Sequence, residues 1–307
     1  MFRKTKTGPR ELLSKQPFIK NRADLQKFLS YVKFAPYSTE LVESFAQEFF
    51  RAQRALGKRG IIVINVYNAL SEVLRLSSYD FAYPLVYTEK KVSHLLLARV
   101  HEVICENLRR ILKRGINDCI FRIAGSENAT PPYLPPSLFR EYVVYYDYSL
   151  INIIQEHKAI AELHCHGKIG QVLESIASMH PDALDPIEPF PFGDITLERV
   201  KKKIGSKVCL IGNVPATGLL HYYNEQETEK CVRNAIKAGT PGGGFILSPT
   251  SFLSIGRFNA TQENNIIQFI QSGLKYGQCY QFSSKPVRSD NDKISLQNLP
   301  KSPTPRE

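Results

Sequence analysis

The sequence predicts an α/β fold built around a parallel β-sheet. Longer segments with helical periodicity alternate with short apolar runs, which is the pattern of βα units. The short runs are almost continuously apolar, as is typical of parallel strands buried on both faces. The six predicted strands are residues 61–66, 119–124, 161–166, 183–188, 208–214 and 244–249.

The predicted helices begin and end at residues that commonly cap helices. Ser38 or Thr39 precedes the first long periodic segment, and Asp194 is the predicted N-cap of another. Glycine is common just after a helix. The predicted helix ends are Gly57, Gly115, Gly205 and Gly239.

A (β/α)8 barrel explains the strand ends better than a dinucleotide-binding fold. No Gly-x-Gly-x-x-Gly motif follows the first strand. Polar residues instead gather where the strands end, the face of a barrel that holds the active site. These residues are Arg122, His164, His166, Asp185, Glu188, Asn213 and Ser248. Only about six of the eight strands are found, so the predicted barrel is N-terminally incomplete.

The predicted barrel domain covers residues 1–282, and the polar, aperiodic segment 283–307 is predicted to be a disordered tail. An incomplete barrel exposes strand edges, so we expect a homo-oligomer. No apolar run is long enough to cross a membrane. The six cysteines form no Cys-x-x-Cys pair, which favours reduced core residues and a cytoplasmic location.

The net charge of +11 is concentrated in two places, residues 1–20 and residues 199–203. A basic chain could attract nucleic acid or a polycarboxylate ligand. No nucleic-acid-binding motif accompanies the charge, so solvated helix faces and loose ends explain it better. We therefore expect no nucleic-acid partner.

The stretch "LHCHGKIG" (163–170) holds the strongest candidate for a metal site. Alternate residues of a strand share one side, so His164 and His166 would face the barrel interior and Cys165 the helices. Two imidazoles could bind Zn²⁺ with Glu188 or Asp185, at the end of the next strand, as the third ligand. The alternative is a pair of histidines that bind substrate or backbone without a metal.

Other candidates lie in the loops that follow the strands. Gly167 permits a tight turn and precedes backbone amides that could bind an anionic cofactor. Glu188, between two prolines, could also act as a general base. Arg122 or Glu127 could hold a carboxylated ligand, although a structural Arg–Glu pair explains them almost as well. Asn213 could orient a polar group of the substrate.

At these residues the sequence resembles the uroporphyrinogen decarboxylase superfamily, which includes the cobalamin-dependent methyltransferases. The matching stretches occur in order along the chain: "ELHCHGKIGQVLE", "ALDPIEPFPFGDITLERVKKKIG", "CLIGNV" and "PGGGFILSPTS". The resemblance extends from about Gly8 to Gly277. It implies a (β/α)8 barrel with its site at the carboxyl ends of the strands.

The chain departs from the superfamily in two ways. The methyltransferase branch binds zinc through His-x-Cys and a distant cysteine, whereas His166 and Ser251 stand at the two cysteine positions here. A metal site here would therefore use harder ligands, with nitrogen and oxygen atoms in place of thiolates. The decarboxylase branch carries its substrate-binding arginine and catalytic aspartate on early strands, and no such segment precedes "TKTGPRELLSK".

Three functions remain open. The first is a methyltransferase that receives a methylated corrinoid from a partner protein, with a metal at His164 and His166 acting as Lewis acid. The second is the decarboxylation of uroporphyrinogen, a tetrapyrrole of haem synthesis, which needs no cofactor in the family. The third is a truncated family member without catalytic activity.

Overall fold

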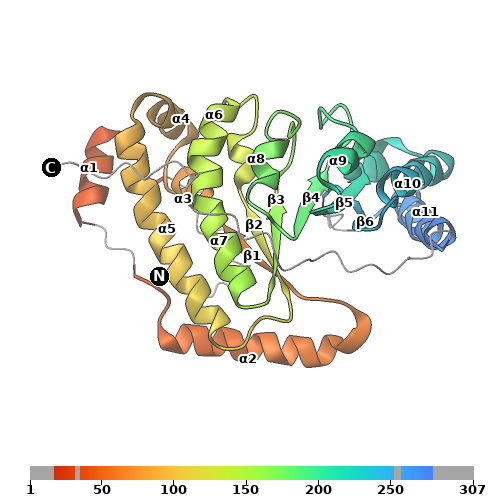
Figure 1. The fold of residues 1–307 in the computed structure, drawn as a ribbon, viewed down its shortest axis with the longest axis horizontal. Helices are drawn as coiled ribbons and strands as arrows, with labels where there is room; N and C mark the ends of the chain where they lie inside the picture. The colour runs from red at the N-terminus through yellow and green to blue at the C-terminus, as the bar shows by residue number, and fades with distance from the viewer. Residues whose placement is uncertain (1–16, 32–34, 252–256, 279–307) are drawn as a thin grey trace.

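The computed structural model describes residues 17–31, 35–251 and 257–278. Six parallel strands form one sheet, and their order across the sheet is their order along the chain (Figure 1). All six predicted strands are confirmed, each within two residues of its predicted limits. The strands are β1 (Val63–Tyr67), β2 (Ile120–Ala124), β3 (Ile160–His164), β4 (Ala183–Ile187), β5 (Cys209–Val214) and β6 (Phe245–Pro249).

The sheet is of the (β/α)8-barrel type, with helices between successive parallel strands. Within the described residues it is not closed, because β1 pairs only with β2, and β6 pairs only with β5. The two outer strands therefore present one unpaired edge each in this part of the chain. Homo-oligomerisation through these edges stays a prediction.

The helices cover the sheet in the order that the βα pattern predicts. Before β1 lie α1 (Arg22–Tyr31) and α2 (Thr39–Leu56), and between β1 and β2 lie α3 (Ala69–Leu76), α4 (Tyr79–Thr88) and α5 (Lys90–Leu112). Between β2 and β3 lie α6 (Pro136–Phe139), a π-helical turn (Arg140–Val144) and α7 (Tyr145–Glu156). The later helices are α8 (Leu173–Ala177), α9 (Leu197–Ile204), a π-helical turn (Gly218–Tyr222), α10 (Glu225–Gly239) and α11 (Ala260–Gly277).

Most predicted caps are found, but one is wrong. The Ser38 side chain accepts a hydrogen bond from the Leu41 amide at 3.2 Å and begins α2. Thr196, not Asp194, is the N-cap of α9. The Asp194 carboxylate instead accepts a hydrogen bond from the Gly170 amide at 2.8 Å, which ties the loop after β4 to the loop after β3.

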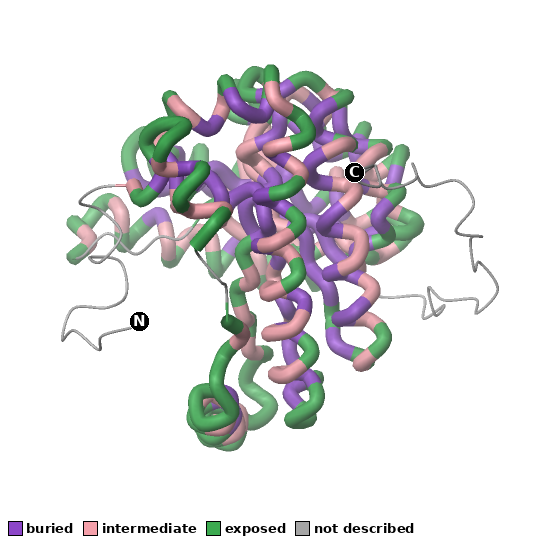
Figure 2. The backbone as a smooth tube through the Cα atoms, turned by 90° about the vertical axis from the view of Figure 1, so that its left-hand side faces the viewer, coloured by how far each residue is buried: buried purple, intermediate pink, exposed green. Residues whose placement is uncertain are grey.

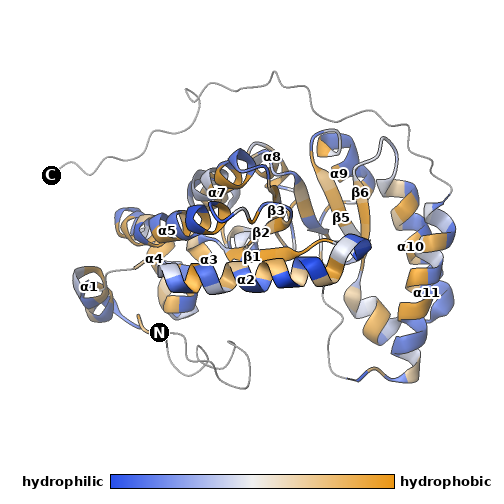
Figure 3. Cartoon of the chain, turned by 90° about the horizontal axis from the view of Figure 1, so that it is seen from below, coloured by the Kyte–Doolittle hydropathy of each residue, from blue (hydrophilic) through white to orange (hydrophobic). Residues whose placement is uncertain are grey.

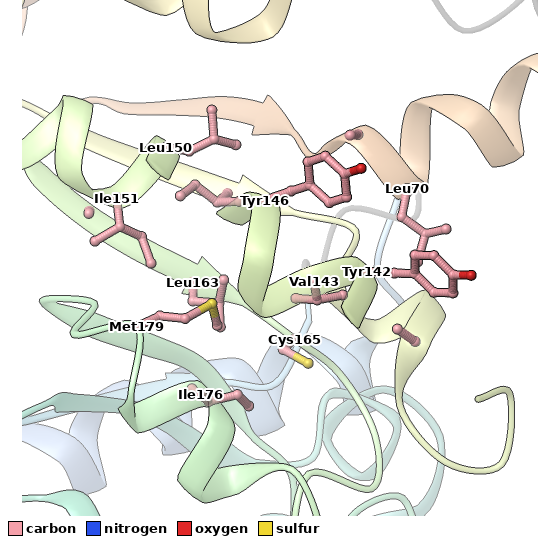
Figure 4. Packing of buried hydrophobic residues seen from close by; sticks show 14 of the residues in the cluster. Leu70, Tyr142, Val143, Tyr146, Leu150, Ile151, Leu163, Cys165, Ile176 and Met179 are labelled. Carbon is pink, nitrogen blue, oxygen red and sulfur yellow. The ribbon is translucent and has the colours of Figure 1, made fainter. Parts of the chain in front are cut away.

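The main core lies between β2, β3 and the helices α5 and α7. Figure 4 shows Leu163 and Cys165 among side chains of α7 and α8, and both residues are fully buried. Buried residues run through the interior of the body, and exposed residues lie on its outer helices and loops (Figure 2). This packing fixes the carboxyl end of β3, because Leu163 and Cys165 flank His164 in the chain.

The helix α2 is amphipathic, and its ribbon carries both hydrophilic and hydrophobic residues (Figure 3). Its buried residues are Val42, Ala46 and Phe49, spaced as one face of a helix. In Figure 1 it lies crosswise beneath the sheet, on the side away from α4 and α6. The opposite side, where the strands end, carries the loops of the candidate site.

Five cysteines of the described residues are free thiols, and burial raises the pKa of all five: Cys105, Cys119, Cys165, Cys209 and Cys231. Cys279 and the predicted tail 283–307 lie outside the described residues. In the described part of the chain, no helix combines the length and the apolar character needed to span a bilayer.

Candidate functional site

Polar side chains of three neighbouring strands meet in a cluster that extends from the middle of β2, β3 and β4 to the carboxyl end of β3. The parallel register pairs Arg122 with Glu162 and, one level further along, His164 with Asp185. Residues at one level of a parallel sheet lie side by side, and alternate residues of one strand share a face. The sheet therefore gathers these four side chains into one cluster.

Arg122 and His164 both contact the carboxylates of this cluster. The Arg122 Nε atom donates a hydrogen bond to Glu162 Oε1, and its guanidinium lies 3.5 Å from Asp185 Oδ2. The same Asp185 oxygen lies 2.7 Å from His164 Nδ1. Burial raises the pKa of Glu162, and the Arg122 contact opposes that rise. Glu162 is only 1 % exposed, so the Arg122 charge compensates a deeply buried carboxylate.

The two predicted histidines lie against each other at the carboxyl end of β3, His164 as its last residue and His166 just beyond it. Their ring centroids are 4.6 Å apart, and the rings are nearly perpendicular. Cys165, between them in the chain, is fully buried among the helices. His166 Nδ1 lies 3.3 Å from Glu188 Oε1. Each imidazole thus has its Nδ1 atom against a carboxylate, that of Asp185 on β4 or that of Glu188 just after β4. Histidines in metal and acid–base sites are commonly oriented by such contacts.

Two tight backbone turns hold Glu188 in place. Gly167 has φ of +86°, a conformation that favours glycine, and its amide donates to Glu188 Oε2 at 2.7 Å. A side-chain carbon at Gly193 would lie 2.0 Å from the Glu188 carbonyl oxygen, so only glycine fits there. The Gly167 amide, predicted to bind an anionic cofactor, is therefore bonded to a carboxylate of the chain itself.

One group of three side chains could hold a metal ion within the described residues. It consists of Glu162, His164 and Asp185, whose donor atoms all lie within 4.8 Å of one another. One imidazole and two carboxylates are donors that Zn²⁺ accepts, and three protein ligands leave a position open for substrate. This group shares His164 with the predicted set of His164, His166 and Glu188.

Two other predicted residues make contacts within the chain. Asn213 donates from Nδ2 to the Ile187 carbonyl oxygen at 2.8 Å and so joins β5 to the end of β4. Glu127 accepts a hydrogen bond from the Gly125 amide at 3.1 Å in the turn after β2. The negative charge of Glu127 also acts on His166. The roles predicted for both residues in ligand binding stay predictions.

Comparison with known proteins places this fold and site in a family. The model of the uroporphyrinogen decarboxylase family matches residues 73–272, which is well over half of the chain and includes β2 to β6. The chain belongs to the uroporphyrinogen decarboxylase family. A uroporphyrinogen decarboxylase of Legionella pneumophila (strain Lens) is 29 % identical over 175 residues, which are 55 % of this chain and 44 % of that protein. The chain thus spans less than half the length of this curated relative.

A solved methyltransferase structure has a similar fold. The methyltransferase from Methanosarcina mazei superposes with a TM-score of 0.62 at 16 % identity, covering 79 % of this chain and 68 % of that one. At this identity the likeness concerns the fold alone. It supports the assignment of β1 to β6 to a barrel of the (β/α)8 type.

Two residues of this family member's site were not singled out from the sequence. Glu162 precedes His164 by two positions, so the alternation that paired His164 with His166 could also have identified it. Asp147 lies on α7 and is fully buried. Its Oδ2 atom accepts hydrogen bonds at 2.9 Å from both Asn68 Nδ2 and Ser126 Oγ. No sequence pattern singles out Asp147, because its hydrogen-bond partners Asn68 and Ser126 belong to the turns that follow β1 and β2.

The titration of His166 offers a direct test of the site geometry. Burial lowers its pKa, but the Glu188 contact and nearby negative charges outweigh burial, so that the pKa lies above its ordinary value. Glu188→Gln should therefore lower the His166 pKa, measured by NMR titration of the imidazole. Glu127→Gln removes a charge but no contact and should lower it less. An unchanged His166 pKa in Glu188→Gln would contradict the observed pairing.

Proposed function

We propose that this chain is a metal-dependent methyltransferase of the uroporphyrinogen decarboxylase family. The observation that carries the proposal is the three-donor group Glu162, His164 and Asp185 on the neighbouring strands β3 and β4. A Zn²⁺ ion held there would act as a Lewis acid on the heteroatom that gains or loses the methyl group. The methyl carrier would be a corrinoid presented by a partner protein at this end of the barrel.

The charge of the site favours a cation over an anionic substrate. Four carboxylates gather around the two histidines and Arg122: Glu127, Glu162, Asp185 and Glu188. The carboxylates outnumber the one permanent positive charge, so the site has an excess of negative charge. Such a site attracts a metal ion and repels a substrate with many carboxylates.

The other side chains have distinct roles in this proposal. His166 retains a proton to a higher pH than an ordinary histidine. When the methyl group passes from a substrate heteroatom to the corrinoid, His166 would give this proton to that heteroatom. Glu188 orients His166 and also fixes the turn at Gly167. Asn213 holds the end of β4 against β5 and so positions Asp185 and Glu188.

Metal binding tests the proposal without an assay for the unknown substrate. We expect protein purified without chelators to bind about one equivalent of Zn²⁺. Glu162→Gln and His164→Ala should each weaken binding at least about tenfold, since each removes one of three ligands. The exposed Glu198→Gln, with the same charge change, should bind like the wild type. Negligible zinc in the wild type would remove the metal from the proposal.

A further variant, His166→Ala, separates the three-donor group Glu162, His164 and Asp185 from the ligand set predicted from the sequence. If His166→Ala loses zinc and Glu162→Gln retains it, the ligands are those predicted from the sequence, His164, His166 and Glu188. If Glu162→Gln loses zinc and His166→Ala retains it, the ligands are Glu162, His164 and Asp185. The metal content of both purified variants gives the answer.

The names of the curated relatives favour a second candidate, decarboxylation of uroporphyrinogen. Its substrate carries carboxylates, which suit the acidic site poorly. Incubation with uroporphyrinogen and chromatography of the products tests it directly. Release of carbon dioxide by zinc-free protein would favour the decarboxylase. A protein that neither binds zinc nor consumes uroporphyrinogen would be a non-catalytic member of the family.

The free thiols and the unpaired sheet edges suggest a compartment and an oligomeric state for the protein. The free thiols of the described residues favour a reducing compartment, and we assign the protein to the cytoplasm. We assign residues 1–282 to one barrel domain and residues 283–307 to a tail. The unpaired edges of β1 and β6 would bring two copies together.

A further inference from the structure

We propose that the Arg122 guanidinium and the metal ion compete for the same two carboxylates, so that metal can bind only when Arg122 moves away. This inference rests on the proposed metal site and concerns its regulation. It goes beyond the ligand set, because it makes metal occupancy and the position of Arg122 mutually exclusive.

The contacts of Arg122 carry the first step of the argument. The guanidinium group reaches Glu162 through Nε and lies 3.5 Å from Asp185 Oδ2. These are two of the three residues in the candidate metal group. Arg122 lies on β2, beside Glu162 in the sheet register, and its side chain is 16 % exposed. The protein therefore places its own cation against two of the three ligands.

Charge repulsion prevents the Arg122 guanidinium and a metal ion from binding the same carboxylates together. A guanidinium is positively charged at every physiological pH, and it would lie within a few ångströms of a divalent ion held by the same carboxylates. At that separation, in a partly buried site, the repulsion of the two charges is far larger than in water. In addition, an oxygen that accepts a hydrogen bond from Arg122 is a weaker metal ligand.

The competition also gives Arg122 a second position. Once a metal compensates Glu162 and Asp185, these carboxylates no longer need the guanidinium. Arg122 is then released toward the open end of the strands, where it can bind an anionic group of the substrate or of the methyl carrier. Metal loading would thus prepare the site for its second ligand.

The test compares zinc affinity in Arg122→Met and in wild-type protein, by competition with a chromophoric chelator. We expect Arg122→Met to bind Zn²⁺ at least about tenfold more tightly, because a competing positive charge is gone. Arg199→Met is the matched control, since Arg199 is exposed on α9 and its loss changes the net charge equally. The double variant Arg122→Met/Glu162→Gln should lose the gain.

A measurement on the wild type keeps the inference testable if Arg122→Met does not fold. Phenylglyoxal should modify Arg122 faster in zinc-loaded protein than in zinc-free protein, as followed by mass spectrometry. An equal rate with and without bound zinc would overturn the competition.

The outcomes distinguish this inference from the proposed function. Tight zinc binding that needs Glu162 but is unchanged in Arg122→Met would preserve the metal site and overturn the competition. Absence of zinc binding in both proteins would overturn both proposals. Tighter binding in Arg122→Met alone, lost again in the double variant, supports both.

Discussion

Asp147→Asn should make the protein more stable at pH 8 and should leave it close to wild-type stability at pH 4. Asp147 is fully buried, and burial raises its pKa to about 7, well above the 3.8 of an ordinary aspartate. In the folded state the carboxyl group therefore holds its proton across the range in which the unfolded chain releases it. Unfolding releases this proton, so stability is full below about pH 4 and falls as the pH rises toward 7.

The expected size of this effect is large. A difference of about three pKa units corresponds to roughly 4 kcal/mol of unfolding free energy lost between pH 4 and pH 8. Asparagine does not titrate, and its side-chain oxygen can still accept the hydrogen bonds of Asn68 and Ser126. Urea unfolding of both proteins at pH 4, 6 and 8 measures the difference. A difference that does not change with pH would show that Asp147 titrates normally.

Asp147→Ala is the control for the hydrogen bonds. It removes the acceptor as well as the charge and leaves Asn68 and Ser126 without their buried partner. We expect it to be less stable than Asp147→Asn at every pH, by about 1–3 kcal/mol. Similar stabilities of the two variants would mean that the hydrogen bonds to Asp147 contribute little.

Gly125→Ala should strongly destabilise the protein. Gly125 follows β2 with φ of +113°, and an added side-chain carbon would lie 2.3 Å from Ser71 Cβ and 2.8 Å from Asn68 Oδ1. The Asn68 oxygen also caps α3 by accepting a hydrogen bond from the Ser71 amide. The clash and the backbone strain together should cost roughly 2–5 kcal/mol in the free energy of unfolding, measured by urea denaturation.

Gly115→Ala separates the two causes. Gly115 also has a positive φ, +79°, but an added carbon would meet no atom within 4 Å. Only the backbone cost remains there, about 1–2 kcal/mol. If Gly125→Ala costs no more than Gly115→Ala, α3 can move aside and the packing after β2 is looser than the structure shows.

The sequence predicts the strands well because each one reads as a short apolar run. The inner strands β2 to β5 are mostly buried. The residues of the outer strands β1 and β6 are half-buried or exposed, so burial on both faces was wrong for these two. The alternation of residues along a strand also predicts that His164 and His166 lie together with Cys165 turned away, which is their arrangement in the structure. These predictions depend only on neighbours along the chain, which the sequence contains directly.

The remaining features depend on contacts between different strands. Aspartate is common at N-caps, but the Asp194 carboxylate instead accepts a hydrogen bond from the Gly170 amide in the loop after β3. Arg122 and Glu162 meet only because β2 and β3 pair in one register. Asp147 on α7 is joined by hydrogen bonds to Asn68, which follows β1, and to Ser126, which follows β2. A single sequence does not contain these pairings, so the sequence could predict the candidates but not their partners.

The most direct test of the account is a crystal structure of zinc-soaked protein, with anomalous diffraction recorded on both sides of the zinc absorption edge. We predict one zinc peak among the carboxylates of Glu162 and Asp185 and the imidazole of His164, with the Arg122 side chain turned away from them. Absence of zinc from this cluster, with Arg122 still bound to Glu162, would contradict the account.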